Sequence, residues 1–413
     1  MNYNEDNKNE DYNDDVNKGN QITDNNKKSN NNKFIDFCKC IKNFDIFNFI
    51  KLKKNDKICP NQNKDLENKY EESFKYYCEL YKNNINDHIE NPENNTTIGL
   101  INLLNDCYII TFLQILFHTP NFLNILKKYN YNKGETIINY LILVSEYRFN
   151  VNYVYKLKKL FGDINLEYSK PYSNDSQEFG IDLINYLISQ LNRPIDDNYI
   201  EVQFCNDEEL IDMKKKVYKN FISIYQKNIN EIENLFLFNQ IDIFCKSNNK
   251  KPKIFANLHI ELTLQKMNNN IKIEELLENK YNYNFDNINI NSNQIIIKSK
   301  LANLPNILII SINRALNNEA LNNSYIIFEE RLDLKQYIDN DLYINQNNIT
   351  TYRLYAINEC FHSFSISHYK CSINIKNKWY IFDDNNIVKE ISHINKNSNT
   401  IVGLFYIRDD LIN

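Results

Sequence analysis

Three side chains of complementary chemistry lie far apart in this sequence: a thiol, an imidazole and a carboxylate. Cys107 begins the apolar run CYIITFLQILF, which predicts a buried helix, and the dipole of a helix lowers the pKa of a thiol at its N-terminus. His368 precedes a strand expected over 369–375, where apolar and polar residues alternate. A Cys and a His placed in this way predict catalysis by a nucleophilic thiolate. The ordinary alternatives are a buried structural Cys and a His without a catalytic role.

Asp383 supplies the third group if the chain turns back after the strand at 369–375. Residues 379–382 would then form the second strand of a hairpin, and Asp383 would return to the level of His368. A carboxylate in that place holds an imidazole in one tautomer and stabilises its charged form. The alternative is a plain turn, because the sequence DDNN at 383–386 has the composition of one.

The elements that must position these groups follow from hydrophobic periodicity. Helical patterns come first along the chain and strand patterns dominate after about residue 236, which predicts an α+β fold. Besides the helix at 107–117, helices are expected over 134–160, 177–192 and 207–235, further strands over 304–312 and 401–407, and loops over 282–294 and 315–324.

Composition excludes several classes of protein. The 413 residues include 48 Lys and Arg against 53 Asp and Glu, and a net charge of −5 argues against binding nucleic acid by neutralising phosphates. The sequence contains no run of 18 apolar residues, so it predicts no membrane-spanning helix. Nine Cys residues without regular spacing, and no recognisable signal peptide, predict an intracellular, cytoplasmic and/or nuclear protein.

Three segments around these residues resemble the ubiquitin-specific proteases, which are papain-like ubiquitin carboxyl-terminal hydrolases. Residues 99–122 resemble the family's Cys box, 352–384 its His box, and 173–187 a helix between the two. The matching residues are Gly99, Leu100, Asn102, Asn105, Cys107, Tyr108, Leu113, Gln114 and Leu116, then Asp175, Glu178 and Phe179, then Tyr352, Leu354, Ala356, His368, Tyr369, Trp379, Phe382, Asp383 and Asp384. The strands at 304–314, 332–338 and 404–408 fall in the family's order.

The resemblance implies a thumb–palm–fingers cysteine protease with a helical thumb and an antiparallel palm sheet. Its catalytic domain is expected over 96–408, with the thumb at about 96–200, the fingers at about 201–300 and the palm at about 301–408. Residues 1–33, almost all Asn, Asp, Lys and Glu, are expected to be a disordered tail. Residues 34–95 form an N-terminal extension of unknown role.

The resemblance also implies roles for the five residues of the expected catalytic centre. Cys107 would attack the carbonyl after the last Gly of ubiquitin, and His368 would take the thiol proton and later protonate the leaving amine. Asp383 would orient His368, with Asp384 as its support or substitute. Asn102, five residues before the nucleophile, would donate its amide to the oxyanion.

Three further residues are implied in binding the ubiquitin tail. Asp175 and Glu178 would face its Arg side chains, and Tyr369 would line the narrow channel for the Gly-Gly end. The alternative for the acidic pair is a helix cap with capping-box spacing.

Several positions depart from the family's pattern. Leu104 and Asp106 stand where the family has Gly and Thr, and a carboxylate beside the nucleophile opposes thiolate formation. Ile366 and Ser367 replace the Gly-Gly before the His, in a loop that must admit the tail. The fingers lack the paired Cys-x-x-Cys of zinc-binding members, so no structural zinc and no cofactor are expected.

Four functions therefore stay open. The first is an active deubiquitinating protease acting on ubiquitin or ubiquitinated proteins. The second is a weak or inactive ubiquitin-binding module of the same fold, which the departures motivate. The third, an unrelated papain-like peptidase or transferase, does not need the matches at 173–187 and 304–314. The fourth is a protease for another ubiquitin-like modifier.

Overall fold

The computed structural model divides the chain into two compact units, Met1–Ile58 and Cys59–Asn413, and the residues it describes all lie in the second. The tail expected at 1–33, the first part of the extension at 34–95 and most of the loop expected at 282–294 lie outside the described residues. The described residues are 60–88, 97–129, 134–191, 209–225, 229–246, 249–264, 270–282, 295–316, 321–342, 349–363, 366–386 and 388–412.

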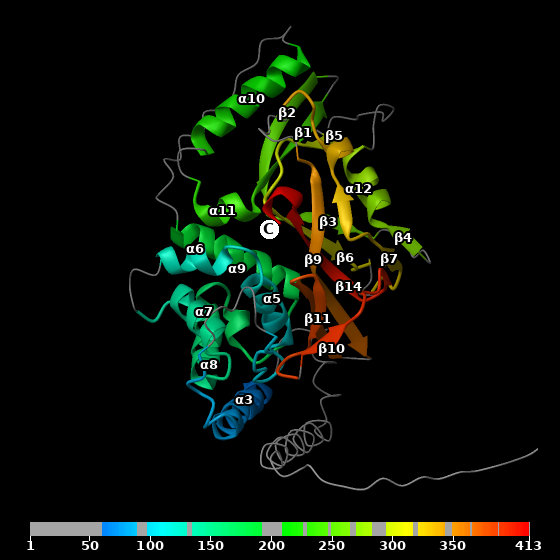
Figure 1. Cartoon of the computed structure of the whole chain (residues 1–413). Coiled ribbons are helices and arrows are strands. Elements are labelled where there is room, and N and C mark those ends of the chain that lie inside the picture. The colour runs from blue at the N-terminus through cyan, green and yellow to red at the C-terminus, as the bar shows by residue number, and fades with distance from the viewer. Residues whose placement is uncertain are drawn as a thin grey trace, which may run out of the picture. The chain divides into compact units, whose positions relative to one another are not determined.

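One side of the second unit is a layer of helices, the thumb (Figure 1). Its central helix is α5 (Cys107–Phe117), in which every residue is buried, as its apolar sequence predicts. α5 packs against α9 (Ser176–Leu191) and against the palm strand β10 (Ile366–Ile375). The other thumb helices are α6 (Phe122–Tyr129), α7 (Ile137–Glu146), α8 (Val151–Leu160) and α11 (Glu231–Phe236), with short 3-10 turns at Phe161–Asp163 and Leu166–Ser169.

The expectation of one helix over 134–160 is wrong, because α7 and α8 are separate. The Asn150 side chain caps the N-terminus of α8, which favours a new helix start over continuation. Arg148 lies in the break and is fully buried, and its guanidinium donates hydrogen bonds to the Gln114 side chain and the Ile98 carbonyl. The break therefore supplies a buried cation that ties α5 to the segment preceding it.

The other side is an eight-stranded sheet, the palm, with strand order β12-β11-β10-β9-β14-β6-β3 and with β8 paired to β9. Its pairs are antiparallel except for β3 and β6, which are parallel. The strands expected near 304–312, 369–375 and 401–407 are present as β6, β10 and β14. The remaining bounds are β3 (Ile260–Thr263), β6 (Ile307–Asn313), β8 (Arg331–Asp333), β9 (Thr351–Ser363), β11 (Lys378–Phe382), β12 (Lys389–Ile391) and β14 (Ile401–Arg408), followed by a 3-10 turn at Asp409–Leu411.

A smaller sheet, the fingers, extends beyond the palm (Figure 1). It pairs β1 (Phe238–Lys246) with β2 (Asn249–Asn257) on one side and β5 (Ile295–Leu301) on the other. The helix expected over 207–235 is two helices among the described residues, α11 in the thumb and α10 (Leu210–Tyr225), which packs against β2. The other elements are α12 (Ile273–Tyr281), a 3-10 turn at Lys335–Tyr337 and a small sheet of β4 (Asn270–Lys272), β7 (Tyr325–Ile327) and β13 (Asn397–Ser398).

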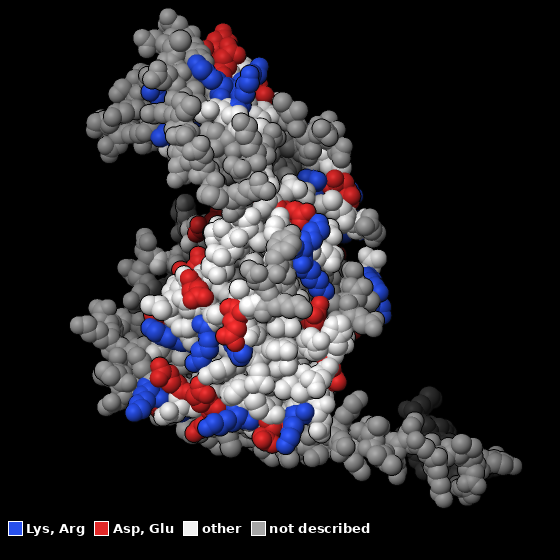
Figure 2. Space-filling model, turned by 90° about the vertical axis from the view of Figure 1, so that its left-hand side faces the viewer, with Lys and Arg blue, Asp and Glu red and all other residues white. Residues whose placement is uncertain are grey.

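An N-terminal helix, α3 (Pro60–Leu80), packs against α8 at the base of the thumb (Figure 1). Helices in one layer and a mainly antiparallel sheet in the other confirm the α+β class and the papain-like architecture. No single described helix is long and apolar enough to cross a membrane, although α5 and α6, bent by 92°, pass the length and composition test as a pair. On the helical face, basic and acidic side chains are interspersed (Figure 2).

Candidate active site

The nucleophile candidate is fixed by the start of α5. Cys107 is the first residue of this helix and is 4% exposed. The turn before it places Asn105 at φ 55°, a left-handed conformation that Asn tolerates better than most residues. The Asn102 side-chain oxygen accepts a hydrogen bond of 3.0 Å from the Asp106 N–H. Asn102 therefore ties its own segment to the turn that carries Cys107.

A hairpin of the palm brings the imidazole and its carboxylate together. β10 and β11 pair in the expected register, with Cys371 opposite Phe382, so that Asp383 follows the end of β11. His368 Nε2 lies 2.7 Å from Asp383 Oδ1. His368 also forms a side-chain hydrogen bond with Cys107, and the Cys107 Sγ lies 3.9 Å from the carbonyl oxygen of the neighbouring Ser367. The thiol, imidazole and carboxylate therefore meet where the thumb contacts the palm.

The electrostatics of this group favour a charged imidazole. The hydrogen bond that His368 donates to Asp383, and next its hydrogen bond with Cys107, raise the pKa of His368 to about 10. The same hydrogen bond to His368 lowers the pKa of Asp383. His368 is therefore protonated at neutral pH when it lies beside these two groups, which is the state that pairs with a thiolate.

Asp384 holds the Asn102 side chain. The Asn102 amide nitrogen donates a hydrogen bond of 2.9 Å to Asp384 Oδ2, which leaves its second N–H for another acceptor. Burial raises the pKa of Asp384 to about 6, although the neighbouring His368 charge opposes this shift. Asp384 thus contacts Asn102, whereas Asp383 contacts His368, and the two adjacent carboxylates have different partners.

The backbone of the same turn joins the two layers. Asp384 has φ 52°, and its carbonyl accepts a hydrogen bond of 3.2 Å from the Leu100 N–H. A Cβ at Gly99 would lie 2.2 Å from this carbonyl oxygen, so only Gly fits there at this distance. The chain, which has 6 Gly in all, keeps one where the thumb and palm backbones touch.

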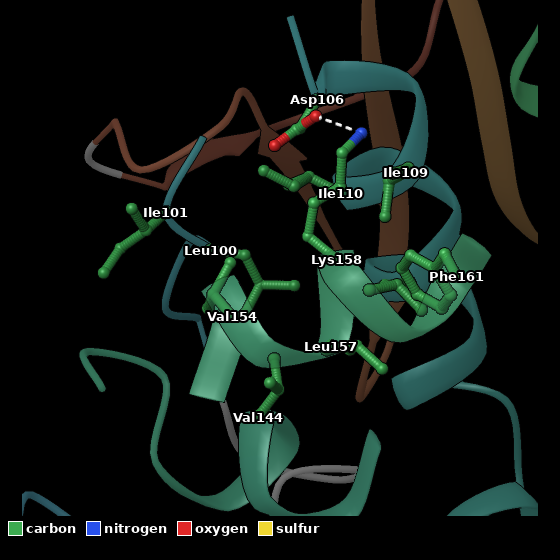
Figure 3. Close-up of a pocket in the computed structure, with 11 residues that line it drawn as sticks. Leu100, Ile101, Asp106, Ile109, Ile110, Val144, Val154, Leu157, Lys158 and Phe161 are labelled. Atoms are coloured by element: carbon green, nitrogen blue, oxygen red, sulfur yellow. Dashed lines mark ion pairs between the residues drawn. The ribbon is translucent and has the colours of Figure 1, made fainter. Parts of the chain in front are cut away.

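The carboxylate of Asp106 lies in a buried ion pair. Its Oδ1 lies 2.7 Å from Lys158 Nζ, and both side chains are less than 5% exposed. Figure 3 shows Lys158 rising from α8 toward Asp106 beside a cavity of about 20 Å³, a volume sufficient for one water molecule. Burial raises the pKa of Asp106 and lowers that of Lys158, while their mutual attraction opposes both shifts. The charge that the sequence places beside Cys107 is therefore offset by a cation.

The Gly-Gly replacements at Ile366 and Ser367 are strand residues. Ile366 pairs with Ser363 and Ser367 with His362 in the β9–β10 ladder, so both have extended backbones that require no glycine. The Ser367 hydroxyl also lies 2.9 Å from His362 Nδ1. Neither residue is among the described residues with a positive φ, so the side chains at these two positions do not conflict with the backbone.

The residues expected to bind a substrate tail lie near the same hairpin. Asp175 is exposed and accepts hydrogen bonds of 2.7 and 2.9 Å from the Gln177 and Glu178 N–H groups, so it caps the start of α9. Glu178 is also exposed. Tyr369 is 4% exposed, and burial followed by the Asp175 charge raises the pKa of its hydroxyl. Asp175 therefore caps α9, as the alternative interpretation predicts. Its charge also acts on the Tyr369 hydroxyl of β10.

Sequence analysis missed Lys158 and the Ser367 carbonyl. A signal for Lys158 exists: it follows Val151 by seven residues and Val154 by four, which places it on the apolar face of α8. A lysine on such a face needs a buried partner. The Ser367 carbonyl has no sequence signal, because any residue supplies the same atom.

The same groups offer the donor set of a metal site. Ligand atoms of His368, Asp383 and Asp384 lie within 4.8 Å of one another. In the described part of the chain, two of these side chains bond to each other and the third bonds to Asn102. These contacts account for the arrangement of the three groups.

Comparisons with known proteins address the fold and the family. The SAGA DUB module Ubp8/Sgf11/Sus1/Sgf73 bound to monoubiquitin matches with a TM-score of 0.55 and 16% identity over 82% of this chain and 74% of that chain. The same module bound to ubiquitin aldehyde matches with a TM-score of 0.55 and 18% identity over the same shares. A yeast SAGA DUB module with a mutant Sgf73 matches with a TM-score of 0.55 and 18% identity over 79% of this chain and 71% of that chain. At these identities the likeness shows the fold.

The sequence itself decides the family. No curated protein matches the chain. The profile of the ubiquitin carboxyl-terminal hydrolases, however, matches residues 98–406, which include both the Cys box and the His box. The chain therefore belongs to the ubiquitin carboxyl-terminal hydrolase family.

Proposed function

We propose that this protein is a deubiquitinating thiol protease that hydrolyses the peptide or isopeptide bond after the C-terminal Gly of ubiquitin. The observation that carries the proposal is the meeting of Cys107, His368 and Asp383 at the thumb–palm contact of a domain of this family. Ubiquitin as the modifier is supported by the family and by similar structures that hold ubiquitin or ubiquitin aldehyde.

The proposed reaction begins with the Cys107 thiolate beside protonated His368. Attack on the carbonyl carbon forms a C–S bond and moves the π electrons onto oxygen, and the second Asn102 N–H donates to that oxyanion. His368 then gives its proton to the leaving amine as the C–N bond breaks, which leaves a thioester. His368 then deprotonates a water molecule, and the attack of its oxygen on the thioester carbon breaks the C–S bond. This step releases the ubiquitin carboxyl group and restores the Cys107 thiolate beside protonated His368. Asp383 stabilises the imidazolium in both steps.

Two features support an active enzyme over an inactive binding module. The Asp106 carboxylate, which would oppose a thiolate, is paired with Lys158. Ile366 and Ser367 lie in regular strand pairing that still presents His368 to Asp383. The departures from the family's pattern therefore have local partners, and all the reacting groups are present.

The first test is reaction with a ubiquitin probe that carries a C-terminal electrophile. We expect wild-type protein to gain the mass of one ubiquitin and Cys107→Ala to gain none, because only the thiolate forms the adduct. Ubiquitin binding without labelling of the wild type would instead support the inactive module. Labelling by a probe built on another ubiquitin-like modifier, with none by ubiquitin, would identify a different substrate.

The pH dependence of kcat/KM tests the role of Asp383. His368 has a raised pKa, so its charge is present below that value and is lost as the pH rises through it. Asp383→Asn removes the main cause of the raised pKa, and we expect the alkaline limb of the profile to move down by about one pH unit or more. A limb that stays in place would contradict the assignment of Asp383, and Asp384→Asn then tests the neighbouring carboxylate.

A further inference from the structure

Helix α3 lies outside the family match at 98–406, yet it packs against the segment that leads to the nucleophile. Tyr70 and Tyr77 of α3 are buried in one cluster with Ile101 and Leu103, and Leu104 packs on its edge. Leu104 is one of the departures from the family's pattern, where glycine would offer no side chain. The residue that replaces the glycine therefore packs against a cluster to which a helix outside the family profile contributes.

α3 also holds the backbone beside Asn102. The Ser73 hydroxyl donates a hydrogen bond to the Leu103 carbonyl, and both groups are buried. Tyr70 faces Asp106, whose charge, after burial, is the next largest cause that raises the pKa of the tyrosine hydroxyl. The segment at 101–106, which contains Asn102 and ends next to Cys107, is thus fixed from the α3 side along its length.

The end of α3 reaches the palm turn on the opposite side of the site. Tyr81, whose N–H donates to the Tyr77 carbonyl, extends the last turn of the helix. Its hydroxyl accepts a hydrogen bond of 3.2 Å from the Asn385 side chain. Stacking on Tyr77 and Phe149, at centroid distances of 6.1 and 5.3 Å, fixes the Tyr81 ring. Asn385 follows Asp384, the residue that holds Asn102.

We propose that α3 is a positioning element of the catalytic centre, which acts through Ser73 on Asn102 and through Tyr81 on Asp384. The Asn102–Asp384 hydrogen bond joins the thumb and the palm, and α3 contacts the chain next to both of its ends. Left-handed backbone at Asn105 and Asp384 is costly for residues with a Cβ and persists only where its surroundings hold it. The expected effect on kcat rests on the proposed function. The expected effect on the backbone next to Asn102 and Asp384 does not.

The kinetic test uses Ser73→Ala and Tyr81→Phe, combined in the full chain, with a ubiquitin substrate. We expect kcat to fall about fivefold to tenfold with little change in KM, because oxyanion contacts strengthen in the transition state. In an Asp384→Ala background Tyr81→Phe should add much less to the loss, because the path from Tyr81 through Asp384 to Asn102 is already broken. Tyr155→Phe is the matched control: it removes a 2.6 Å hydrogen bond from α8 to Glu71 of α3, away from the site.

A second readout does not depend on activity. Hydrogen–deuterium exchange should rise at 97–106 and 383–386 in the α3 variant and stay near the wild-type rate in Tyr155→Phe. Unchanged exchange in these two segments would overturn the positioning role, as would a kcat within twofold of an active wild type. If the wild type is inactive but the exchange pattern is as expected, the proposed function is wrong and the structural role of α3 stands. If the combined variant fails to fold, Asn385→Ala takes its place. This substitution removes the palm side of the contact, and hydrogen–deuterium exchange at 97–106 must rise in it as well.

Discussion

Replacing His368 by Ala is expected to lower kcat on an amide-linked ubiquitin substrate by about 10²- to 10⁴-fold, the range typical of general acid–base catalysis. His368 has three roles in the proposed mechanism: it stabilises the Cys107 thiolate, it protonates the leaving amine, and it deprotonates the water that hydrolyses the thioester. Only the second role depends on the leaving group. A ubiquitin thioester, whose leaving thiolate needs no proton, should therefore lose much less rate than the amide in the same variant.

The comparison between leaving groups separates catalysis from damage to the fold. His393→Ala is the control, because His393 is exposed and lies in the loop after β12. It should leave both rates near those of the wild type. An equal loss on amide and thioester substrates would contradict a role for His368 as the acid, and a loss below tenfold on the amide would contradict its catalytic role altogether.

Lys158→Met is expected to lower the free energy of unfolding by about 3–5 kcal/mol, the usual cost of leaving one member of a buried ion pair without its partner. The Asp106 carboxylate would remain in a site where it is less than 5% exposed. Met matches the length of the lysine stem, so the loss reports the charge more than the volume. Urea unfolding followed by circular dichroism measures the difference.

The double variant Asp106→Thr with Lys158→Met tests the cause. Because both charges are removed together, most of the lost stability should return. Lys156→Met, two residues away on α8, provides the control: its side chain is half exposed, and pairs of this kind contribute about 0–1 kcal/mol. If Lys158→Met costs no more than Lys156→Met, the buried pair does not stabilise the thumb. Slower alkylation of Cys107 in the single variant alone would report the uncompensated charge.

Local patterns predict much of this fold, because burial repeats with the period of each element. The all-apolar α5, the alternation in β10 and the turn composition after β11 are each visible within about ten residues. The break between α7 and α8 was not predictable from periodicity, because apolar residues continue across it. It depends on an Asn cap and on a buried Arg148 whose acceptors, at Ile98 and Gln114, lie far away in the sequence.

The candidate site likewise has residues that can be predicted from the sequence and features that cannot. The reactive side chains carry their own chemical identity, so Cys107, His368 and Asp383 can be proposed from sequence. The division of labour between Asp383 and Asp384 cannot, because it depends on which partner each carboxylate meets across the thumb–palm contact. Lys158 has an indirect signal, its place on the apolar face of α8, but the sequence does not name its partner. Tyr81 has no signal, because its role depends on what it faces and many Tyr residues in this chain look the same.

The close approach at Gly99 has a counterpart deeper in the same contact. A Cβ on Gly403 of β14 would lie 2.3 Å from the Gln177 side chain of α9, as a Cβ on Gly99 would meet Asp384. Cys107 and His368 sit on opposite layers, so the separation of these layers sets the distance between nucleophile and base. A single added methyl group at either glycine must push the layers apart or displace a neighbour. The distance between the Cys107 thiol and the His368 imidazole therefore depends on two residues that have no side chain.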